Sequence, residues 1–247
     1  MQVVTLALGA ALYFDHELAA DPQPLVTLWT RIAKQPGLRS WTLPATSSSK
    51  PVDFNPARLA ARIASGKTIV VGVETRNRDV TITVGTTPSA QLDRRPPAPR
   101  WKYDLAVGLG ADRVAALGQD NIVEALCTFA SATAASAGIV VWSASIDFAR
   151  ALASLSSGPD LQPAHVTALI DAQVSRGRWG DVIRGPAWGT FLSAAHVAAL
   201  GGRALPVART MPLSSGGAFL QATLEPFDVE APPPVLAELR EVLAPVC

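Results

Sequence analysis

Apolar positions along this chain of 247 residues follow two periods, and each period predicts one kind of element. Val80, Ile82 and Val84 alternate with threonines, which is typical of a strand. The Asn77-Arg78-Asp79 run before them predicts a hairpin turn. By such patterns, strands are predicted over Val3–Phe14, Thr68–Glu74, Val80–Thr86, Tyr103–Leu109, Ile139–Ser143 and Ala218–Leu224.

Helices are predicted where apolar residues recur three or four positions apart. Leu59 and Ile63 are one such pair, and the Asn55-Pro56 pair before them is typical of a helix start. The predicted helices cover Pro24–Lys34, Ala57–Ser65, Asn121–Ala137, Asp147–Leu155, Pro163–Val174, Ser193–Leu200 and Val235–Leu243.

The loose alternation of strands and helices, with at least one hairpin, predicts an α+β fold. We expect a mixed or antiparallel sheet with helices packed on it. The length fits one large domain or two small ones, and we expect a single domain over residues 1–247. The Pro- and Arg-rich residues 88–100 are the best place for an internal boundary. Each half can be interpreted as a strand–helix–strand unit, which would make the domain two similar halves.

Charge is nearly balanced overall but unevenly distributed. Residues 1–100 hold 12 Lys/Arg and 7 Asp/Glu, whereas residues 101–247 hold 9 and 13. A near-neutral chain lacks the basic stripe expected of a protein that binds nucleic acid directly. The acidic excess lies from Glu225 onward. It forms either a solvated acidic helix or a docking face for a basic partner.

No motif for catalysis, a cofactor or a metal is recognisable, so we expect no enzyme activity, no cofactor and no metal site. The three histidines, His16, His165 and His196, are far apart and have none of the spacings typical of metal ligands. Cys127 lies in an apolar predicted helix and is interpreted as a small buried hydrophobe. A disulfide to Cys247 is allowed but not required, and this usage is typical of a reducing cytosol.

Two apolar runs could be mistaken for targeting or membrane segments. The first, Val3–Phe14, lacks the basic start of a signal peptide, because no Lys or Arg precedes Arg31. The longest, Ile122–Ala144, contains Glu124, several Ser and Thr, and Gly138, which predicts a helix and a strand instead of a membrane span. We therefore expect a cytoplasmic protein without a membrane partner.

Two segments have the composition of contact loops. Residues 175–188 are rich in Gly, Arg and Trp, and Trp and Arg are enriched in interface hot spots. Alternatively, Trp179 packs at the edge of the core and the arginines are solvated. Residues 226–234 form a Pro-stiffened acidic loop, which would lose little entropy on binding, or else a plain surface connection. The predicted partner-binding residues are Arg176, Arg178, Trp179, Asp181, Asp228 and Glu230.

The segment Arg184–Gly202 resembles the C-terminal signature of a family of bacterial immunity proteins from polymorphic-toxin systems. The signature consists of Gly-Pro-x-Trp, a strand like Thr-Phe-Leu, a short helix and Leu-Gly-Gly. The order downstream also fits, with a Gly-containing turn, a strand, a Pro-rich acidic stretch and a last helix, so the resemblance covers roughly residues 180–247. Within the signature, we interpret Gly201-Gly202 as a helix end and Trp188 as a packing residue.

The resemblance implies a cytosolic antidote that binds and blocks a cognate protein toxin, often a nuclease. Two alternatives remain open. One is an enzyme with an unrecognised site, for which Asp147, His165 and Asp171 are the candidate residues. The other is a structural or regulatory protein that self-associates through an exposed apolar face of its last helix, made of Val235, Leu236, Leu239 and Leu243.

Overall fold

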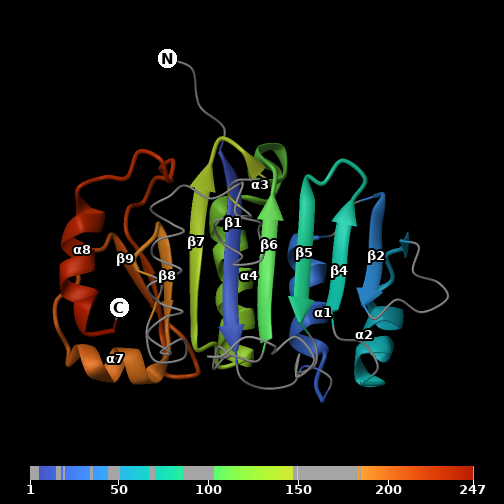
Figure 1. Ribbon diagram of the computed structural model, residues 1–247, viewed down its shortest axis with the longest axis horizontal. Coiled ribbons are helices and arrows are strands. Elements are labelled where there is room, and N and C mark those ends of the chain that lie inside the picture. The colour runs from blue at the N-terminus through green and yellow to red at the C-terminus, as the bar shows by residue number, and fades with distance from the viewer. Residues whose placement is uncertain are drawn as a thin grey trace, which may run out of the picture.

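In the computed structural model the described strands form one open antiparallel sheet, with helices on both faces (Figure 1). The structure describes residues 6–14, 18, 20–33, 36–43, 51–66, 70–85, 103–146, 149, 183 and 185–246. The strands are β1 (Ala7–Phe14), β2 (Leu38–Leu43), β3 (Val52–Asp53), β4 (Val70–Thr75), β5 (Val80–Gly85), β6 (Tyr103–Leu109), β7 (Ala137–Ser143), β8 (Gly189–Leu192), β9 (Arg209–Pro212) and β10 (Ala218–Gln221). Their order across the sheet is β3-β2-β4-β5-β6-β1-β7-β8-β10-β9.

The first strand lies at the centre of the sheet. Leu12 of β1 pairs with Leu105 of β6 on one side and with Gly138 of β7 on the other. All eight residues of β1 are buried, which explains why its sequence is continuously apolar instead of alternating. The first half of the chain supplies β1 to β6, which form the centre and one wing of the sheet, and the second half supplies β7 to β10, which form the other wing.

One face of the sheet is covered by helices from the first half of the chain and its middle (Figure 1). These are α1 (Gln23–Ile32), α2 (Pro56–Ala64), α3 (Ala111–Leu117) and α4 (Gln119–Ala132). Trp29 of α1 and Phe129 of α4 are almost fully buried there, and the Phe129 ring packs edge-on against Phe14 with a centroid distance of 5.8 Å. This larger core holds the wide sheet against its helical layer.

The opposite face of the sheet carries a second core. Here α7 (Ala194–Leu200) and α8 (Val235–Leu243), with a final 3-10 turn at Ala244–Val246, pack on β1, β7, β8 and β10. Leu239 and Leu243 of α8 are completely buried. The C-terminal quarter of the chain therefore supplies the strands at one side of the sheet and the helices that cover one of its faces.

The α+β class and the antiparallel sheet confirm the prediction from sequence. Predicted and observed bounds agree within about two residues for several elements, including β6, which matches at both ends, and α8. The helix predicted to end at Ala137 ends at Ala132 instead, because Ala134 adopts φ 42° and β7 begins at Ala137. The suggested boundary at residues 88–100, and most of the two helices predicted between 147 and 174, lie outside the described residues.

The signature segment folds as an architectural unit, as predicted. Trp188 is 1% exposed and packs edge-on against Trp142 with a centroid distance of 5.2 Å. A Cβ on Gly189 would lie 2.6 Å from the Phe219 ring, so only glycine fits this close approach. Gly201 ends α7 in the left-handed conformation at φ 60°, which glycine adopts without strain.

Candidate interaction surface

The predicted partner-binding residues fall into two groups. Arg176, Arg178, Trp179 and Asp181 lie outside the described residues, so their role stays a prediction. Asp228 and Glu230 lie on the connection between β10 and α8, above the second core. This connection also contains the Pro-rich acidic stretch that follows the signature in the resemblance.

Asp228 anchors this connection to the sheet. One carboxylate oxygen accepts a hydrogen bond from the Ala144 backbone amide at 3.2 Å, and the other accepts from the Glu230 amide at 3.0 Å. The Val229 amide adds a bond to the Trp142 carbonyl at 2.9 Å. Asp228 is half-buried and Glu230 is exposed. Asp228 therefore positions the loop, and Glu230 is the member of the pair whose side chain faces solvent.

Directly after β10, side chains hold the backbone of a short turn at residues 223–225. Gln221 Nε2 donates to the carbonyl oxygens of Thr223 and Leu224, at 3.0 and 3.2 Å. Gln119 Nε2, from the start of α4, donates to the same Leu224 oxygen at 3.2 Å. We call residues 223–225 the clamped turn.

The third carbonyl of the clamped turn is held by the signature tryptophan. Trp188 Nε1 donates to the Glu225 oxygen at 3.2 Å, and the Thr223 hydroxyl donates to it at 2.6 Å. Every carbonyl of the turn thus accepts at least one side-chain hydrogen bond. Since each such bond contributes about 1 kcal/mol, the turn is held in one conformation.

The clamped turn presents a large apolar side chain to solvent. Leu224 is 65% exposed, and Val197, at 37%, is the only other exposed large hydrophobic residue among the described residues. The backbone of Leu224 is fixed while its side chain points outward. A contact residue of this kind loses little conformational entropy when a partner covers it.

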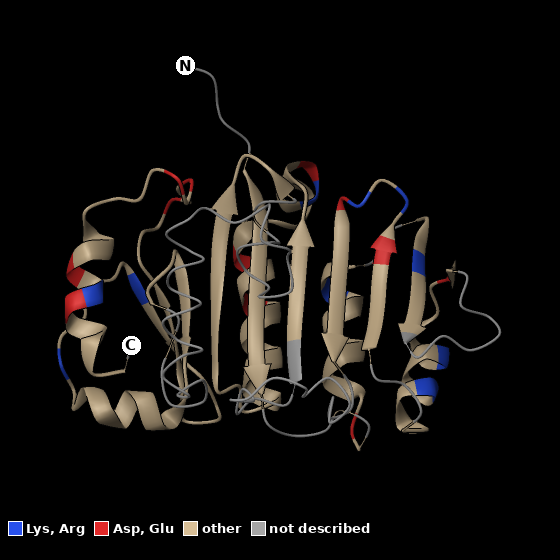
Figure 2. Ribbon diagram, viewed as in Figure 1, with Lys and Arg blue, Asp and Glu red and all other residues tan. Residues whose placement is uncertain are grey.

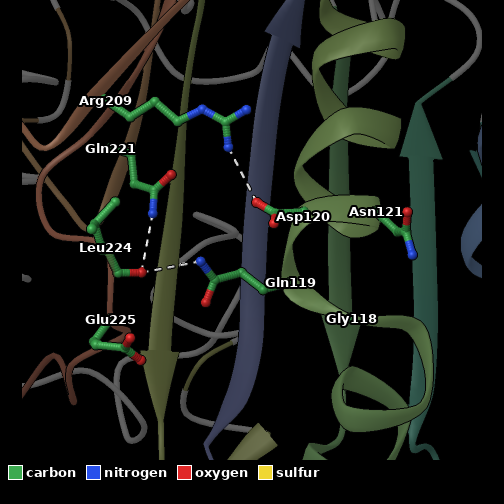
Figure 3. A pocket seen from close by; sticks show the side chains of 8 residues that line it. All are labelled: Gly118, Gln119, Asp120, Asn121, Arg209, Gln221, Leu224 and Glu225. Carbon is green, nitrogen blue, oxygen red and sulfur yellow. Dashed lines mark hydrogen bonds and ion pairs between the residues drawn. The ribbon is translucent and has the colours of Figure 1, made fainter.

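A polar cleft of about 560 Å³ opens on one side of Leu224 (Figure 3). Gln221 and Arg209 line one wall, and the first turn of α4 lines the other. Arg209 Nη1 lies 3.1 Å from an Asp120 carboxylate oxygen, an ion pair between two well-exposed side chains. Such a pair contributes less than about 1 kcal/mol to stability. The lining residues are Gly118, Gln119, Asp120, Asn121, Arg209, Gln221, Leu224 and Glu225.

Gln221 is the unusual residue of this cleft. Its side chain is 2% exposed, its Nε2 is fully used by the clamped turn, and its Oε1 is buried with no hydrogen-bond partner among the residues that the structure describes. A buried carbonyl oxygen without a partner costs about 1–3 kcal/mol. An unpartnered oxygen of this kind is expected at a site where a bound ligand supplies the missing donor.

An open apolar groove lies on the other side of Leu224. Pro206 and Val207, on the chain segment before β9, form part of it, together with Val235 from the start of α8. Leu224 and Glu225 line both the groove and the polar cleft. The groove, Leu224 and the cleft form one continuous surface with an apolar centre and a polar side, which is the usual composition of a protein–protein interface.

The burial of α8 bears on the alternative function of self-association. Leu236, Leu239 and Leu243 are buried in the second core, at 9%, 0% and 0% exposed, so they do not form the exposed face expected for self-association. That expectation was wrong because α8 packs its apolar stripe on the sheet of its own chain. The residues proposed for an unrecognised active site, Asp147, His165 and Asp171, lie outside the described residues.

Cys127 and His196 both have structural surroundings. Cys127 is buried, and burial raises the pKa of its thiol to about 12. His196 is a capping residue: Ser193 accepts from its amide, and its Nδ1 accepts from the Ser193 amide. Within the described ranges no three His, Cys, Asp or Glu side chains gather as metal ligands would. None of the helices described here is both long and apolar enough to cross a membrane.

Comparison with known proteins gives a likeness of fold. No protein-family model matches the chain, and no curated protein matches it. Among solved structures, the Pseudomonas aeruginosa T6SS protein PA0821 is similar, with a TM-score of 0.63 over 98% of this chain and 73% of that one. The two sequences are 16% identical, so the likeness is one of architecture.

Sequence reasoning did not identify the clamped turn. The predicted strand Ala218–Leu224 includes both Gln221 and Leu224, and its pattern does not predict a turn there. A signal was present, since a glutamine between Leu220 and Ala222 is unusual for a buried strand. Two of the donors that complete the turn, Trp188 and Gln119, lie 37 and 105 positions from the residues that accept, so only the fold brings them together.

Proposed function

We propose that this protein is an immunity protein, which binds a cognate bacterial toxin and blocks it. The observation that carries the proposal is the clamped turn, because it fixes an exposed Leu224 between an apolar groove and a polar cleft. Exposed apolar surface that is bordered by polar residues is typical of protein interaction sites. In this proposal the chain acts by binding and not by catalysis.

Two further observations support the proposal. The first is that the surface is built from the segment that resembles polymorphic-toxin immunity proteins: Trp188 of the signature directly holds the Glu225 carbonyl. The second is the fold likeness to a protein named as a T6SS protein, which is compatible with a bacterial toxin system. A nuclease is one class of toxin that such a protein would neutralise.

Tight binding depends on a few strongly contributing residues within the interface. A specific interface buries about 800 Å² on each partner, and a few hot-spot residues supply most of its free energy. Covering one leucine side chain contributes about 1.5–3 kcal/mol. Leu224, flanked by the two hollows, is thus the residue expected to contribute most among the described ones.

The test is co-expression with the product of the neighbouring reading frame. We expect the neighbour to arrest growth alone, growth to return when this chain is present, and the two proteins to purify together through a tag on this chain. An unrelated toxin serves as the control that must not be neutralised. A harmless neighbour, or a toxic one that is neither rescued nor co-purified, would refute the proposal.

A further inference from the structure

We propose that the polar cleft binds an arginine side chain of the toxin. This inference rests on the proposed function and adds the chemistry of the contact. The starting observation is Gln221 Oε1, an acceptor that has no hydrogen-bond partner among the described residues. Gln221 itself is only 2% exposed. Figure 3 shows the Gln221 amide extending from β10 towards the first turn of α4, across the cleft.

The charged groups of the cleft leave an uncompensated carboxylate. Arg209 is already paired with Asp120 at 3.1 Å. Glu225 is exposed, and no ion pair to it occurs within the described residues. An incoming group that carries a positive charge and several donors would match both Glu225 and the Gln221 oxygen. Guanidinium, with five N–H donors, has this chemistry, whereas a carboxylate would add a third negative charge.

The opposite assignment, an anion at the start of α4, has less support. No side chain caps this helix start, and free backbone amides there would favour negative charge. However, Asp120 in the first turn already supplies a carboxylate to that end of the helix. The unpartnered atom of the cleft is also an acceptor, which an anion cannot satisfy. The observations therefore favour a donor and a cation.

The surrounding surface is acidic as well. No Lys or Arg occurs between Arg209 and Arg240, whereas Glu225, Asp228, Glu230 and Glu238 lie in that interval. Figure 2 shows acidic residues on the loop that leads to α8 and on α8 itself. A basic partner would be attracted to this side of the molecule, and its association would slow as salt is added.

The first experiment probes the cleft directly, without the toxin. N-acetyl-arginine methylamide and N-acetyl-glutamate methylamide are titrated into the full chain up to tens of millimolar, and the side-chain amide resonances of Gln221 are followed by NMR. We expect the arginine probe to shift them, the glutamate probe not to, and Glu225→Gln to weaken the response. Glu241→Gln, which removes an equal charge from the exposed end of α8, is the matched control and should leave the response unchanged.

A larger response to the glutamate probe, or none to either probe, would overturn the inference.

The second experiment measures toxin affinity. Glu225→Lys should weaken binding by at least about tenfold, and Glu241→Lys by less than about twofold. Wild-type binding with an unaffected Glu225→Lys would overturn the arginine contact but leave the proposed function standing. Failure of the wild-type chain to bind the toxin would instead overturn the proposed function, and with it the toxin as the source of the arginine.

Discussion

Replacing Gln221 with methionine separates the clamp of the turn from the stability of the fold. Methionine has a similar length and no branching, so it fills the same buried space, but it cannot donate to a carbonyl oxygen. The change removes the bonds to the Thr223 and Leu224 oxygens at 3.0 and 3.2 Å. Leu224 keeps its bond from Gln119, and Thr223 loses its only side-chain donor among the described residues.

Two opposing terms set the effect on the free energy of unfolding. Loss of two hydrogen bonds costs about 2 kcal/mol at about 1 kcal/mol each. Removal of the buried, unpartnered Gln221 Oε1 returns about 1–3 kcal/mol. The terms nearly cancel, so we expect the free energy of unfolding to change by less than about 1 kcal/mol.

Local order and binding should respond differently. Hydrogen exchange at the amides of residues 223–225 should become faster, because the turn is no longer fixed. Toxin affinity should fall about tenfold or more, since ordering each released residue on binding costs about 1 kcal/mol. Gln119→Met, which removes only the 3.2 Å bond to Leu224, is the graded control and should show a smaller effect on both.

The outcome is decided by urea unfolding, hydrogen exchange and calorimetric titration on the same preparations. Destabilisation beyond about 3 kcal/mol would refute the reasoning, because it would mean that the Gln221 oxygen has a partner whose loss is costly. Faster exchange in the turn with unchanged toxin affinity would show that the clamp does not serve binding.

Three further predictions concern the framework and the buried thiol. Gly189→Ala should destabilise the fold by about 1–3 kcal/mol in urea unfolding, because its Cβ would lie 2.6 Å from the Phe219 ring; an unchanged midpoint would contradict this packing. Ser193→Ala should cost about 1 kcal/mol in the same assay through loss of the α7 cap, and a neutral result would contradict the cap. In a Cys247→Ser background Cys127 should resist a thiol reagent near pH 8 until urea is added. Its folded pKa of about 12 lies above the ordinary 9.0, so stability should decline as the pH rises from about 9 towards 12, and rapid native labelling would contradict its burial.

The sequence predicts the centre of the fold well, because burial there is simple. β1 is buried on both faces and reads as a continuous apolar run, and β5 alternates between apolar and Thr positions. The cap at Asn55 was also predicted correctly, since its side chain accepts from the Arg58 amide at 3.0 Å. In these elements the local pattern and the tertiary environment demand the same residues.

The missed strands β2, β3 and β9 lie at or beside the sheet edges, where the alternation of apolar and polar residues is weak or inverted. In β2, Ser40 and Thr42 pair with Val73 and Val71 on the side of the larger core, while Trp41 lies on the opposite side. Small polar residues thus occupy core-facing positions, which alternation alone assigns to solvent. The edge strand β9 has no buried residue, so no apolar signal marks it.

The candidate surface was predicted only in part. Composition drew attention to the acidic loop, and the structure gives Asp228 an anchoring role that its sequence position did not suggest. The clamped turn depends on Gln119, Trp188 and Gln221, which come from a helix, a loop and a strand. Such a convergence depends on strand order, which the local sequence does not encode.

The most direct test of this account is the toxin affinity of Leu224→Asp beside that of Val197→Asp. Both changes put a carboxylate on an exposed apolar position, and Val197 lies at the middle of α7, away from the clamped turn. We predict that Leu224→Asp weakens binding by about 2–4 kcal/mol, roughly 30- to 1,000-fold, whereas Val197→Asp changes it less than about twofold. Equal affinities for the wild-type chain and Leu224→Asp would contradict the account.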